Sequence, residues 1–215
     1  MKFCIIGLGS FGYCLATELT ENGMEVLAID KSEEKINDIR DYVTHAVCAT
    51  IDDEESLRGL GVEDIDTVVV GMGKSFAQSI LVTALLKKRL ETKRVIARAT
   101  TEIHREILEL VGADQVILPE QAMGIRLADT LSSRFLDVFG VGKNFSIGQI
   151  KAPEQFIGKS IDEINFYKNY TLRCVGIKKD DEFVVTSPEH IIDENDVLIF
   201  AGGDEALNEL IKKLR

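Results

Sequence analysis

The 215-residue sequence lacks a long apolar run, and this absence bears on where the protein works. No run approaches the roughly 20 consecutive apolar residues that a membrane-spanning helix requires. The first residues, MKFCIIG, enter a glycine-rich loop too soon for the apolar region of a secretory signal peptide. We therefore expect a cytoplasmic protein.

Positive charge is also scarce. The chain carries 25 Lys and Arg residues against 36 Asp and Glu residues, which gives a formal net charge of -11. Such an excess of negative charge repels the phosphate backbone of nucleic acids and the headgroups of anionic lipids. We therefore expect neither a nucleic-acid partner nor direct binding to an anionic membrane surface.

Cysteine and histidine patterns for metals and disulfides are missing as well. None of the four cysteines forms a C-x-x-C pair, and the three histidines are far apart in the sequence. Cys4 and Cys48 lie in strand-like apolar runs, where cysteine usually acts as a small buried hydrophobe. This usage is typical of a reducing compartment.

The first 118 residues alternate short apolar runs with helical patterns. Residues at helical spacing include Phe11, Leu15 and Leu19. The apolar runs are Lys2–Ile6, Glu25–Ile29, His45–Ala49, Thr67–Met72, Arg94–Ala97 and Gln115–Leu118. Continuous apolar strands between helices predict βαβ units and a Rossmann-like, doubly wound parallel sheet covered on both faces.

The pattern changes after residue 118. Met123, Leu127, Leu131 and Phe135 recur every four residues and predict a long helix. A partner subunit or the chain's own C-terminal part would cover this apolar row. The glycine-marked stretch 139–148 indicates a boundary. We therefore divide the chain into a nucleotide-binding domain (1–118), a helix with a linker (119–144) and a small α+β domain (145–215).

The C-terminal domain shows short apolar runs and two helical patterns. The strands predicted here are Phe145–Lys151, Leu172–Ile177, Glu182–Thr186 and Asp196–Phe200. Helices are predicted over Ser160–Phe166 and Asp204–Leu214, and the second of these has its apolar residues on one face.

The segment IIGLGSFG (5–12) predicts a nucleotide site. Gly7, Gly9 and Gly12 have the spacing G-x-G-x-x-G between a strand and a helix. In such a loop the glycines permit a tight turn, close approach of a phosphate, and close packing of the helix on the strand. The helix N-terminus then offers N–H groups and a positive partial charge to the anion. The alternative is a glycine turn that binds nothing.

Other strand ends should line the same crevice. Asp30 lies 18 residues after Gly12, where a carboxylate accepts hydrogen bonds from ribose hydroxyls and disfavours the 2′-phosphate of NADP. Thr50 follows the third strand, and Gly71, Met72 and Gly73 follow the fourth. Arg98 ends the fifth strand and would either pair with a phosphate or lie exposed on the surface.

Groups for catalysis are harder to find. A dehydrogenase needs a substrate domain with a proton donor, and usually a cationic clamp for the substrate. About 75 residues follow position 140, with His190 as their one histidine and no arginine-rich pocket. This favours a binding protein over a small NAD-dependent oxidoreductase. A Rossmann-type redox sensor that represses transcription would need a basic DNA-binding module, and none is evident.

Longer segments carry a resemblance to a known family. They are VLAID (26–30), HAVCATIDDEESLRGLGV (45–62), VIARATTEIHREILELVGADQVILPEQAMG (95–124), SIDEINF (160–166) and DENDVLIFAGG (193–203). Together with the glycine loop they resemble the cytosolic RCK-domain regulatory subunits of Ktr/Trk-type potassium uptake systems, the KtrA/TrkA family. The resemblance covers essentially the whole chain, and residues 112–124 are its most specific part.

The resemblance implies a fold and a role. It implies a Rossmann-like N-domain that binds ATP, ADP or NAD(H), a crossover helix, and a small C-domain. Dimers of such subunits assemble into a ring, commonly an octamer, beneath a potassium channel or transporter at the inner face of the cell membrane. Nucleotide exchange changes the ring and gates potassium flow, so the implied protein is a regulator and not an enzyme.

Site residues follow from the resemblance where the motifs match. Around the nucleotide it places Gly7, Gly9, Phe11, Gly12, Asp30, Lys31, Gly73 and Arg98, and we count Ser10 of the glycine loop among the candidate site residues. Glu120 matches a glutamate that binds a divalent cation, Mg or Ca, near the phosphates. The alternative for Glu120 is an acid at a helix N-terminus that needs no metal.

Two departures from the family pattern limit what the resemblance implies. Ser10 stands where an arginine often reaches the terminal phosphate, so strong preference for ATP over ADP is not implied. In the C-domain, members that bind cyclic di-AMP have an apolar residue where this chain has Asp162, and an arginine where it has Tyr167. Negative charge near a dianionic ligand is unfavourable, so we do not predict this second ligand.

Overall fold

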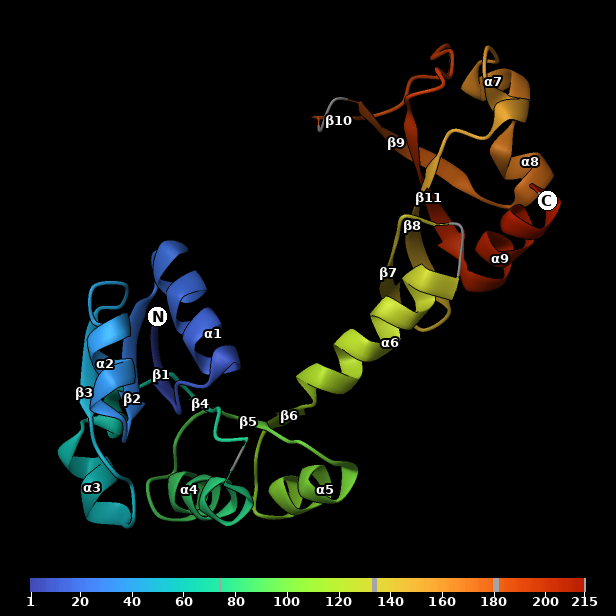
Figure 1. The fold of residues 1–215 in the computed structure, drawn as a ribbon. Coiled ribbons are helices and arrows are strands. Elements are labelled where there is room, and N and C mark those ends of the chain that lie inside the picture. Colours follow the sequence, from blue (N-terminus) through green and yellow to red (C-terminus); the bar gives the residue numbers. More distant parts are fainter. Residues whose placement is uncertain (74, 133–134, 180–181, 215) are drawn as a thin grey trace. The chain divides into compact units, whose positions relative to one another are not determined.

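The computed structural model describes residues 1–73, 75–132, 135–179 and 182–214 (Figure 1). The chain divides into two compact units, Met1–Gln121 and Ala122–Arg215. We describe each unit by itself.

The first unit is built on a six-stranded sheet in the order β3-β2-β1-β4-β5-β6. All of its strand pairs are parallel. Its strands are β1 (Lys2–Ile6), β2 (Glu25–Asp30), β3 (His45–Cys48), β4 (Thr67–Val70), β5 (Val95–Arg98) and β6 (Gln115–Ile117). This order and direction confirm the predicted Rossmann-like, doubly wound sheet.

Helices follow most strands of this sheet (Figure 1). They are α1 (Ser10–Glu21), α2 (Glu33–Ile39), α3 (Glu54–Gly59), the 3-10 turn η1 (Val62–Asp64), α4 (Phe76–Lys88) and α5 (Glu102–Leu110). The sequence analysis did not predict α3, because its six residues bury a single apolar side chain, Leu57, and so show no periodicity. A capping box between Asp53 and Ser56 starts this helix.

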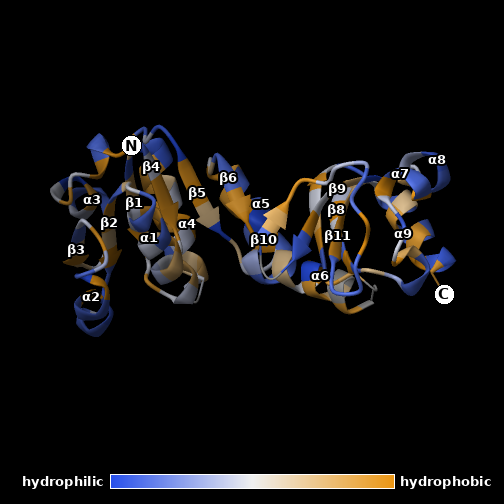
Figure 2. Cartoon of the chain, turned by 90° about the horizontal axis from the view of Figure 1, so that it is seen from above, coloured by the Kyte–Doolittle hydropathy of each residue, from blue (hydrophilic) through white to orange (hydrophobic). Residues whose placement is uncertain are grey.

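Both faces of the first sheet are buried, and side chains alternate between them. Cys4 and Ile6 belong to the hydrophobic cluster on one face, and Ile5 belongs to the cluster on the other. Figure 2 shows the hydrophobic residues concentrated on these strands. Cys4 is fully buried, as expected, but Cys48 is exposed because it ends the edge strand β3.

The second unit contains a five-stranded antiparallel sheet in the order β10-β9-β11-β8-β7. Its strands are β7 (Asp137–Gly142), β8 (Phe145–Lys151), β9 (Arg173–Lys179), β10 (Glu182–Val184) and β11 (Val197–Gly203). The helical elements are η2 (Glu154–Phe156), α7 (Ile161–Ile164), α8 (Phe166–Tyr170) and α9 (Asp204–Lys213). Phe200, fully buried on β11, packs edge-on against Phe166 in the core.

Two features of the second unit differ from the sequence prediction. Residues 137–142, expected in the linker, form the edge strand β7 and pair with β8. The glycines that suggested a boundary lie in this hairpin, where the pairing register shifts between Gly140 and Gly142. The helix predicted over Ser160–Phe166 is interrupted at Asn165, which has a φ of 46° and separates α7 from α8.

The helix α6 (Pro119–Ser132) begins in the first unit and continues in the second. Met123, Leu127 and Leu131 lie on it with exposed fractions of 60%, 54% and 77%. Phe135, predicted to extend this apolar row, instead follows the end of the helix and is buried in the core of the second unit. Its ring lies against Gly148, where a Cβ atom would approach it to 2.8 Å.

Candidate nucleotide-binding site

The glycine loop joins the carboxyl end of β1 to α1. Gly7 has a φ of 97°, and its N–H donates to the carbonyl of Ile29 at 2.8 Å. Gly12 lies in the first turn of α1, and a Cβ atom there would come within 2.0 Å of the carbonyl oxygen of Gly7. Any side chain at position 12 would push the helix away from the loop. The loop conformation therefore requires glycine at both positions.

Gly9 differs from these two glycines because the space around it is open. Apart from Gly9 and its two neighbours in the chain, no described residue has an atom within 4 Å of the position that a Cβ atom would occupy. Gly9 is the N-cap of α1, no described side chain caps that helix, and the first intrahelical bond runs from the N–H of Tyr13 to the carbonyl of Gly9. The preceding N–H groups can therefore receive an anion.

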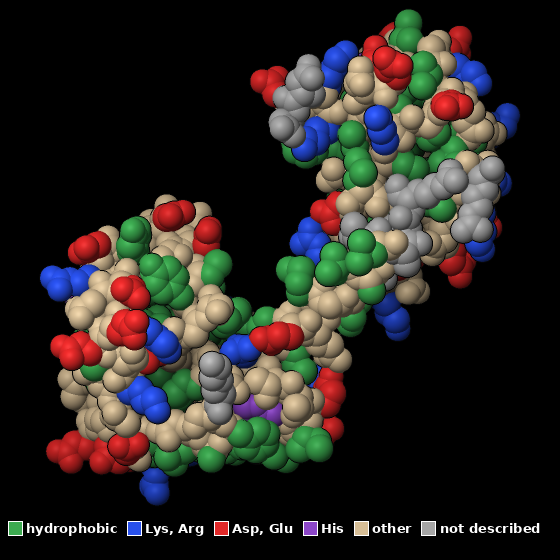
Figure 3. Space-filling model, viewed as in Figure 1, with side chains coloured by type: hydrophobic (Ala, Val, Ile, Leu, Met, Phe, Trp, Pro, Cys, Tyr) green, Lys and Arg blue, Asp and Glu red, His purple; other side chains and the backbone are tan. Residues whose placement is uncertain are grey.

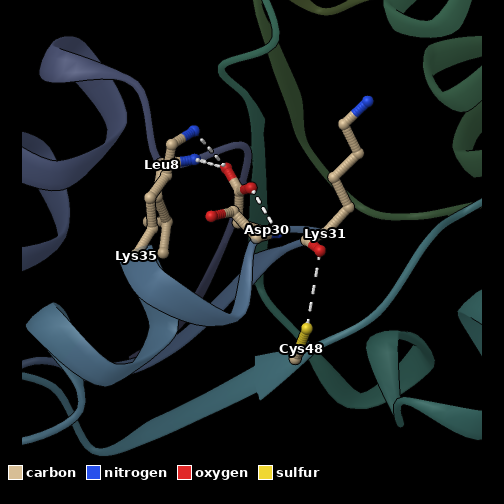
Figure 4. Close-up of polar contacts among 6 residues, drawn as sticks. Leu8, Asp30, Lys31, Lys35 and Cys48 are labelled. Carbon is tan, nitrogen blue, oxygen red and sulfur yellow. Dashed lines mark hydrogen bonds and ion pairs between the residues drawn. The ribbon is translucent and has the colours of Figure 1, made fainter.

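Asp30 is buried at the end of β2 and linked to the glycine loop (Figure 4). One carboxylate oxygen accepts hydrogen bonds from the backbone N–H of Leu8 at 2.7 Å and from the Lys35 ammonium at 3.0 Å. The other accepts from the backbone N–H of Ser32 at 2.9 Å. A carboxylate offers about four acceptor positions, so one remains for a ribose hydroxyl.

The environment of Asp30 keeps it ionised. Burial alone would raise the pKa of this carboxyl group, but the backbone N–H groups of Ser32 and Leu8 and the ammonium of Lys35 outweigh it and hold the pKa below its ordinary value of 3.8. The site therefore presents a fixed negative charge at neutral pH. A fixed carboxylate of this kind can accept hydrogen bonds from ribose hydroxyls and would repel a 2′-phosphate, so the predicted contact with ribose stays a prediction.

Two lysines follow Asp30, and the structure separates their roles. The side chain of Lys31, a predicted site residue, extends away from Asp30, while its carbonyl accepts a long contact from the Cys48 thiol at 3.6 Å (Figure 4). Lys35, which the sequence analysis did not select, forms the ion pair with Asp30 instead. The sequence offers one signal for this ion pair, because Lys35 lies in the first turn of α2, five residues after Asp30.

Arg98 lies at the carboxyl end of β5, with only 15% of its side chain exposed. It is therefore not the exposed surface arginine that the sequence left as an alternative. A Cβ atom at Gly73 would come within 2.3 Å of the guanidinium, so the absence of a side chain there makes room for Arg98. The guanidinium forms an ion pair with Glu120 in the first turn of α6.

The remaining predicted residues lie near the same ends of the strands. Met72 is half-buried and contacts the glycine loop at Gly7. Ser10 and Thr50 are exposed, at the start of α1 and just after β3, and Phe11 is half-buried. Gly71 donates its N–H to the carbonyl of Ile6 at 2.8 Å and so joins the loops after β1 and β4.

The part of the chain that the structure describes contains no group of three or more His, Cys, Asp or Glu residues that could hold a metal ion. Glu120 is a single carboxylate whose contact is the Arg98 guanidinium. By itself, one chain does not fit the cation site that the family resemblance implies at Glu120. Among the described helices, none is both long and apolar enough to span a lipid bilayer.

Sequence comparisons match both units to known domains. Residues 3–119 match the TrkA-N domain, and residues 149–215 match the TrkA-C domain. The Ktr system potassium uptake protein A of Bacillus subtilis (strain 168) is 36% identical over 203 residues. This alignment covers 94% of the present chain and 91% of that relative.

Solved structures resemble the fold of the chain. The crystal structure of the GsuK RCK domain matches with a TM-score of 0.70 and 18% identity, and the match covers 98% of this chain and 47% of that one. The NAD(P)-binding domain of an exopolyphosphatase-related protein from Archaeoglobus fulgidus matches with a TM-score of 0.54 and 30% identity. That match covers 60% of this chain and 96% of the other.

Proposed function

Because the chain belongs to the family of proteins that combine a TrkA-N with a TrkA-C domain, we propose that it is a nucleotide-binding regulatory subunit of a potassium uptake system. Its relative from Bacillus subtilis, named as a Ktr system potassium uptake protein, supports the transport role. The observation that carries the proposal is the open N-terminus of α1 at Gly9, beside the buried carboxylate of Asp30.

The ligand in this proposal is an adenine nucleotide, with ADP or ATP ahead of NAD(H). Phosphates would contact the first N–H groups of α1 and the Arg98 guanidinium, and a ribose would contact Asp30. Around them we place Gly7, Ser10, Phe11, Gly12, Lys31, Thr50, Gly71, Met72 and Gly73. The similarity to an NAD(P)-binding domain supports a nucleotide in this crevice.

The proposed role is binding and not catalysis. The groups that we assign to the nucleotide are backbone N–H donors, the Asp30 carboxylate and the Arg98 guanidinium, which are types of group suited to phosphate and ribose. The divalent cation implied by the resemblance is not part of the proposal for a single chain, because Glu120 contacts Arg98. We also do not propose cyclic di-AMP binding, since Asp162 adds a negative charge to the segment concerned.

The proposed protein works as an assembly beneath a membrane partner. Met123, Leu127 and Leu131 are exposed on α6, and Figure 3 shows hydrophobic side chains gathered along this helix. Soluble proteins usually cover such a row, and a second copy of the chain is the simplest cover. We propose a dimer that assembles further into a ring, an octamer, on the cytoplasmic face of a potassium channel or transporter. Residues 1–118 bind the nucleotide, 119–144 connect and dimerise, and 145–215 form the C-terminal domain.

Calorimetric titration with ATP, ADP, AMP, NAD and NADH tests the proposed site. Gly9→Ala places a methyl group where the phosphate would approach, without touching the described protein atoms. Gly59→Ala is the matched control, because its Cβ atom also meets open space but lies in α3. We expect ADP to bind the native protein and the control alike, and Gly9→Ala to lose about tenfold or more in affinity. Equal affinities in all three proteins would contradict the site.

A further inference from the structure

Two residues that the sequence assigns to different ligands contact each other in the structure. The sequence leaves Arg98 either paired with a phosphate or exposed, and the resemblance leaves Glu120 either a cation ligand or an acid at a helix N-terminus. Instead the guanidinium of Arg98 and the carboxylate of Glu120 form an ion pair between the end of β5 and the first turn of α6. The Glu120 carboxylate neutralises the positive charge of Arg98, and a phosphate would need the same guanidinium as its partner.

The two partners of this ion pair are held very differently. The side chain of Arg98 is 15% exposed, the Gly73 backbone lies against its guanidinium, and its buried Nε has no hydrogen-bond partner among the described residues. Glu120 is 66% exposed and can turn into solvent. When the pair opens, Arg98 therefore stays in place and Glu120 moves.

We propose that Glu120 is a displaceable counter-ion for Arg98, and that the terminal phosphate of the bound nucleotide takes its place. This inference rests on the proposed nucleotide site. A terminal phosphate carries about -1.5 to -2 charges near pH 7, whereas the Glu120 carboxylate carries one, so the phosphate is the stronger partner for the guanidinium. Phosphate and Glu120 compete for the same donor, so nucleotide binding opens the ion pair.

Opening the pair has a consequence for α6. The ion pair links the first turn of this helix to the sheet of the first unit, and the helix continues into the second unit. Phosphate binding removes that link and leaves a free carboxylate at the helix N-terminus. A bound terminal phosphate would therefore release the first turn of α6 from Arg98, and α6 is the segment that joins the two units.

Removal of the negative charge of Glu120 should change the affinity for ADP in one definite direction. Glu120→Gln removes the competing charge, so it should tighten ADP binding in a buffer that contains EDTA. Because Glu120 is exposed and such ion pairs are weak, the gain should be about two- to fivefold in affinity. A role for Glu120 as a cation ligand predicts no gain in EDTA and a loss of affinity when Mg²⁺ is present.

The experiment is a calorimetric titration of ADP in EDTA into the native protein, Glu120→Gln and Glu102→Gln. Glu102 is the matched control because it is an exposed acid in the first turn of the neighbouring helix α5, paired with Arg105. We expect tighter binding in Glu120→Gln alone. We also expect Arg98→Gln to weaken binding, and the added Glu120→Gln change to bring no further gain in that background.

Each outcome of this experiment decides one question. Unchanged or weaker ADP binding by Glu120→Gln, with normal binding by the native protein, overturns the displaceable pair and leaves the proposed site intact. An equal gain in Glu102→Gln also overturns it, because the effect would then be general charge repulsion. No binding of ADP by the native protein overturns the proposed site and the inference together. If Arg98→Gln fails to fold, the comparison of the two glutamate variants still decides.

Discussion

At the scale of single residues, Asp30 has a structural role that the structure shows and a binding role that we propose. Its carboxylate holds the backbone N–H of Leu8 in the glycine loop and still has one acceptor position for a ribose. The sequence predicts the ribose contact from spacing alone. It does not predict the hydrogen bond from Leu8, because that bond depends on how β1 and β2 pair.

Asp30→Ala should therefore lower both nucleotide affinity and stability. Loss of charge-assisted hydrogen bonds to the ribose should weaken ADP binding about ten- to a hundredfold. Leaving the N–H of Leu8 without its partner should cost about 1–3 kcal/mol of unfolding free energy. Calorimetric titration and urea unfolding measure the two effects.

Lys35→Met is the control for Asp30→Ala, since it removes the ion pair but leaves the bonds from Leu8 and Ser32. We expect it to change ADP affinity by less than about threefold. Native ADP affinity in Asp30→Ala would exclude Asp30 from the ribose site.

Ser10 offers a test of nucleotide selectivity. It is exposed at the first position of α1, and the family resemblance implies an arginine near the terminal phosphate at this position. We expect the native protein to bind ATP and ADP with similar affinity, and Ser10→Arg to raise ATP affinity more than ADP affinity. Cys14→Arg adds the same charge to an exposed position further along α1 and should not discriminate. A large ATP preference in the native protein would show that other residues hold that phosphate.

At the scale of elements, the spacing of apolar residues predicts the helix α6 but not its end. The four-residue spacing correctly predicts a helix with an apolar row at Met123, Leu127 and Leu131. It includes Phe135 by mistake, because periodicity does not reveal where the helix ends. The inner strands β1, β2, β4 and β5 were predictable because each is a short apolar run that the sheet largely buries.

Substitutions on α6 test whether its apolar row is an interface. Leu127→Asp together with Leu131→Asp would bury two unpaired carboxylates per subunit in the proposed dimer, which is strongly unfavourable. We expect these changes to lower the oligomer mass measured by light scattering at fixed protein concentration. Nucleotide binding should partly survive, because the crevice residues lie in the first unit.

The control for the α6 variant adds two acids at exposed apolar residues elsewhere, Tyr42→Asp and Val185→Asp. It should keep the native mass. A monomeric native protein, or an α6 variant with undiminished mass, would refute the dimer.

At the scale of the whole molecule, the sequence identifies the fold and most of the crevice but not the contacts inside it. The glycine spacing and Asp30 follow from local motifs, and the structure brings them to the same ends of the strands. The pairing of Arg98 with Glu120 joins residues from β5 and α6, and no local pattern encodes it. Side-chain contacts between distant segments become visible only when the fold is known.

Stability should depend on pH through His104. This residue is fully buried, its Nε2 lies 2.8 Å from the Ser79 hydroxyl, and burial lowers its pKa below the ordinary value of 6.5. As the pH falls below 6.5, the unfolded chain takes up a proton that the folded chain resists, so stability falls until the folded pKa is passed. We expect the melting temperature to drop between pH 7 and pH 5, and to drop less in His104→Gln. Equal drops would contradict this assignment.

In the proposed function, nucleotide occupancy of this protein controls potassium transport. The most direct test measures potassium flux in vesicles that contain the membrane transporter subunit encoded in the same genome, with the purified protein and either ATP or ADP added. We predict that the flux depends on the nucleotide with the native protein and with Gly59→Ala, and that this dependence is lost with Gly9→Ala. A flux that is the same with ATP, with ADP and without nucleotide would contradict the account.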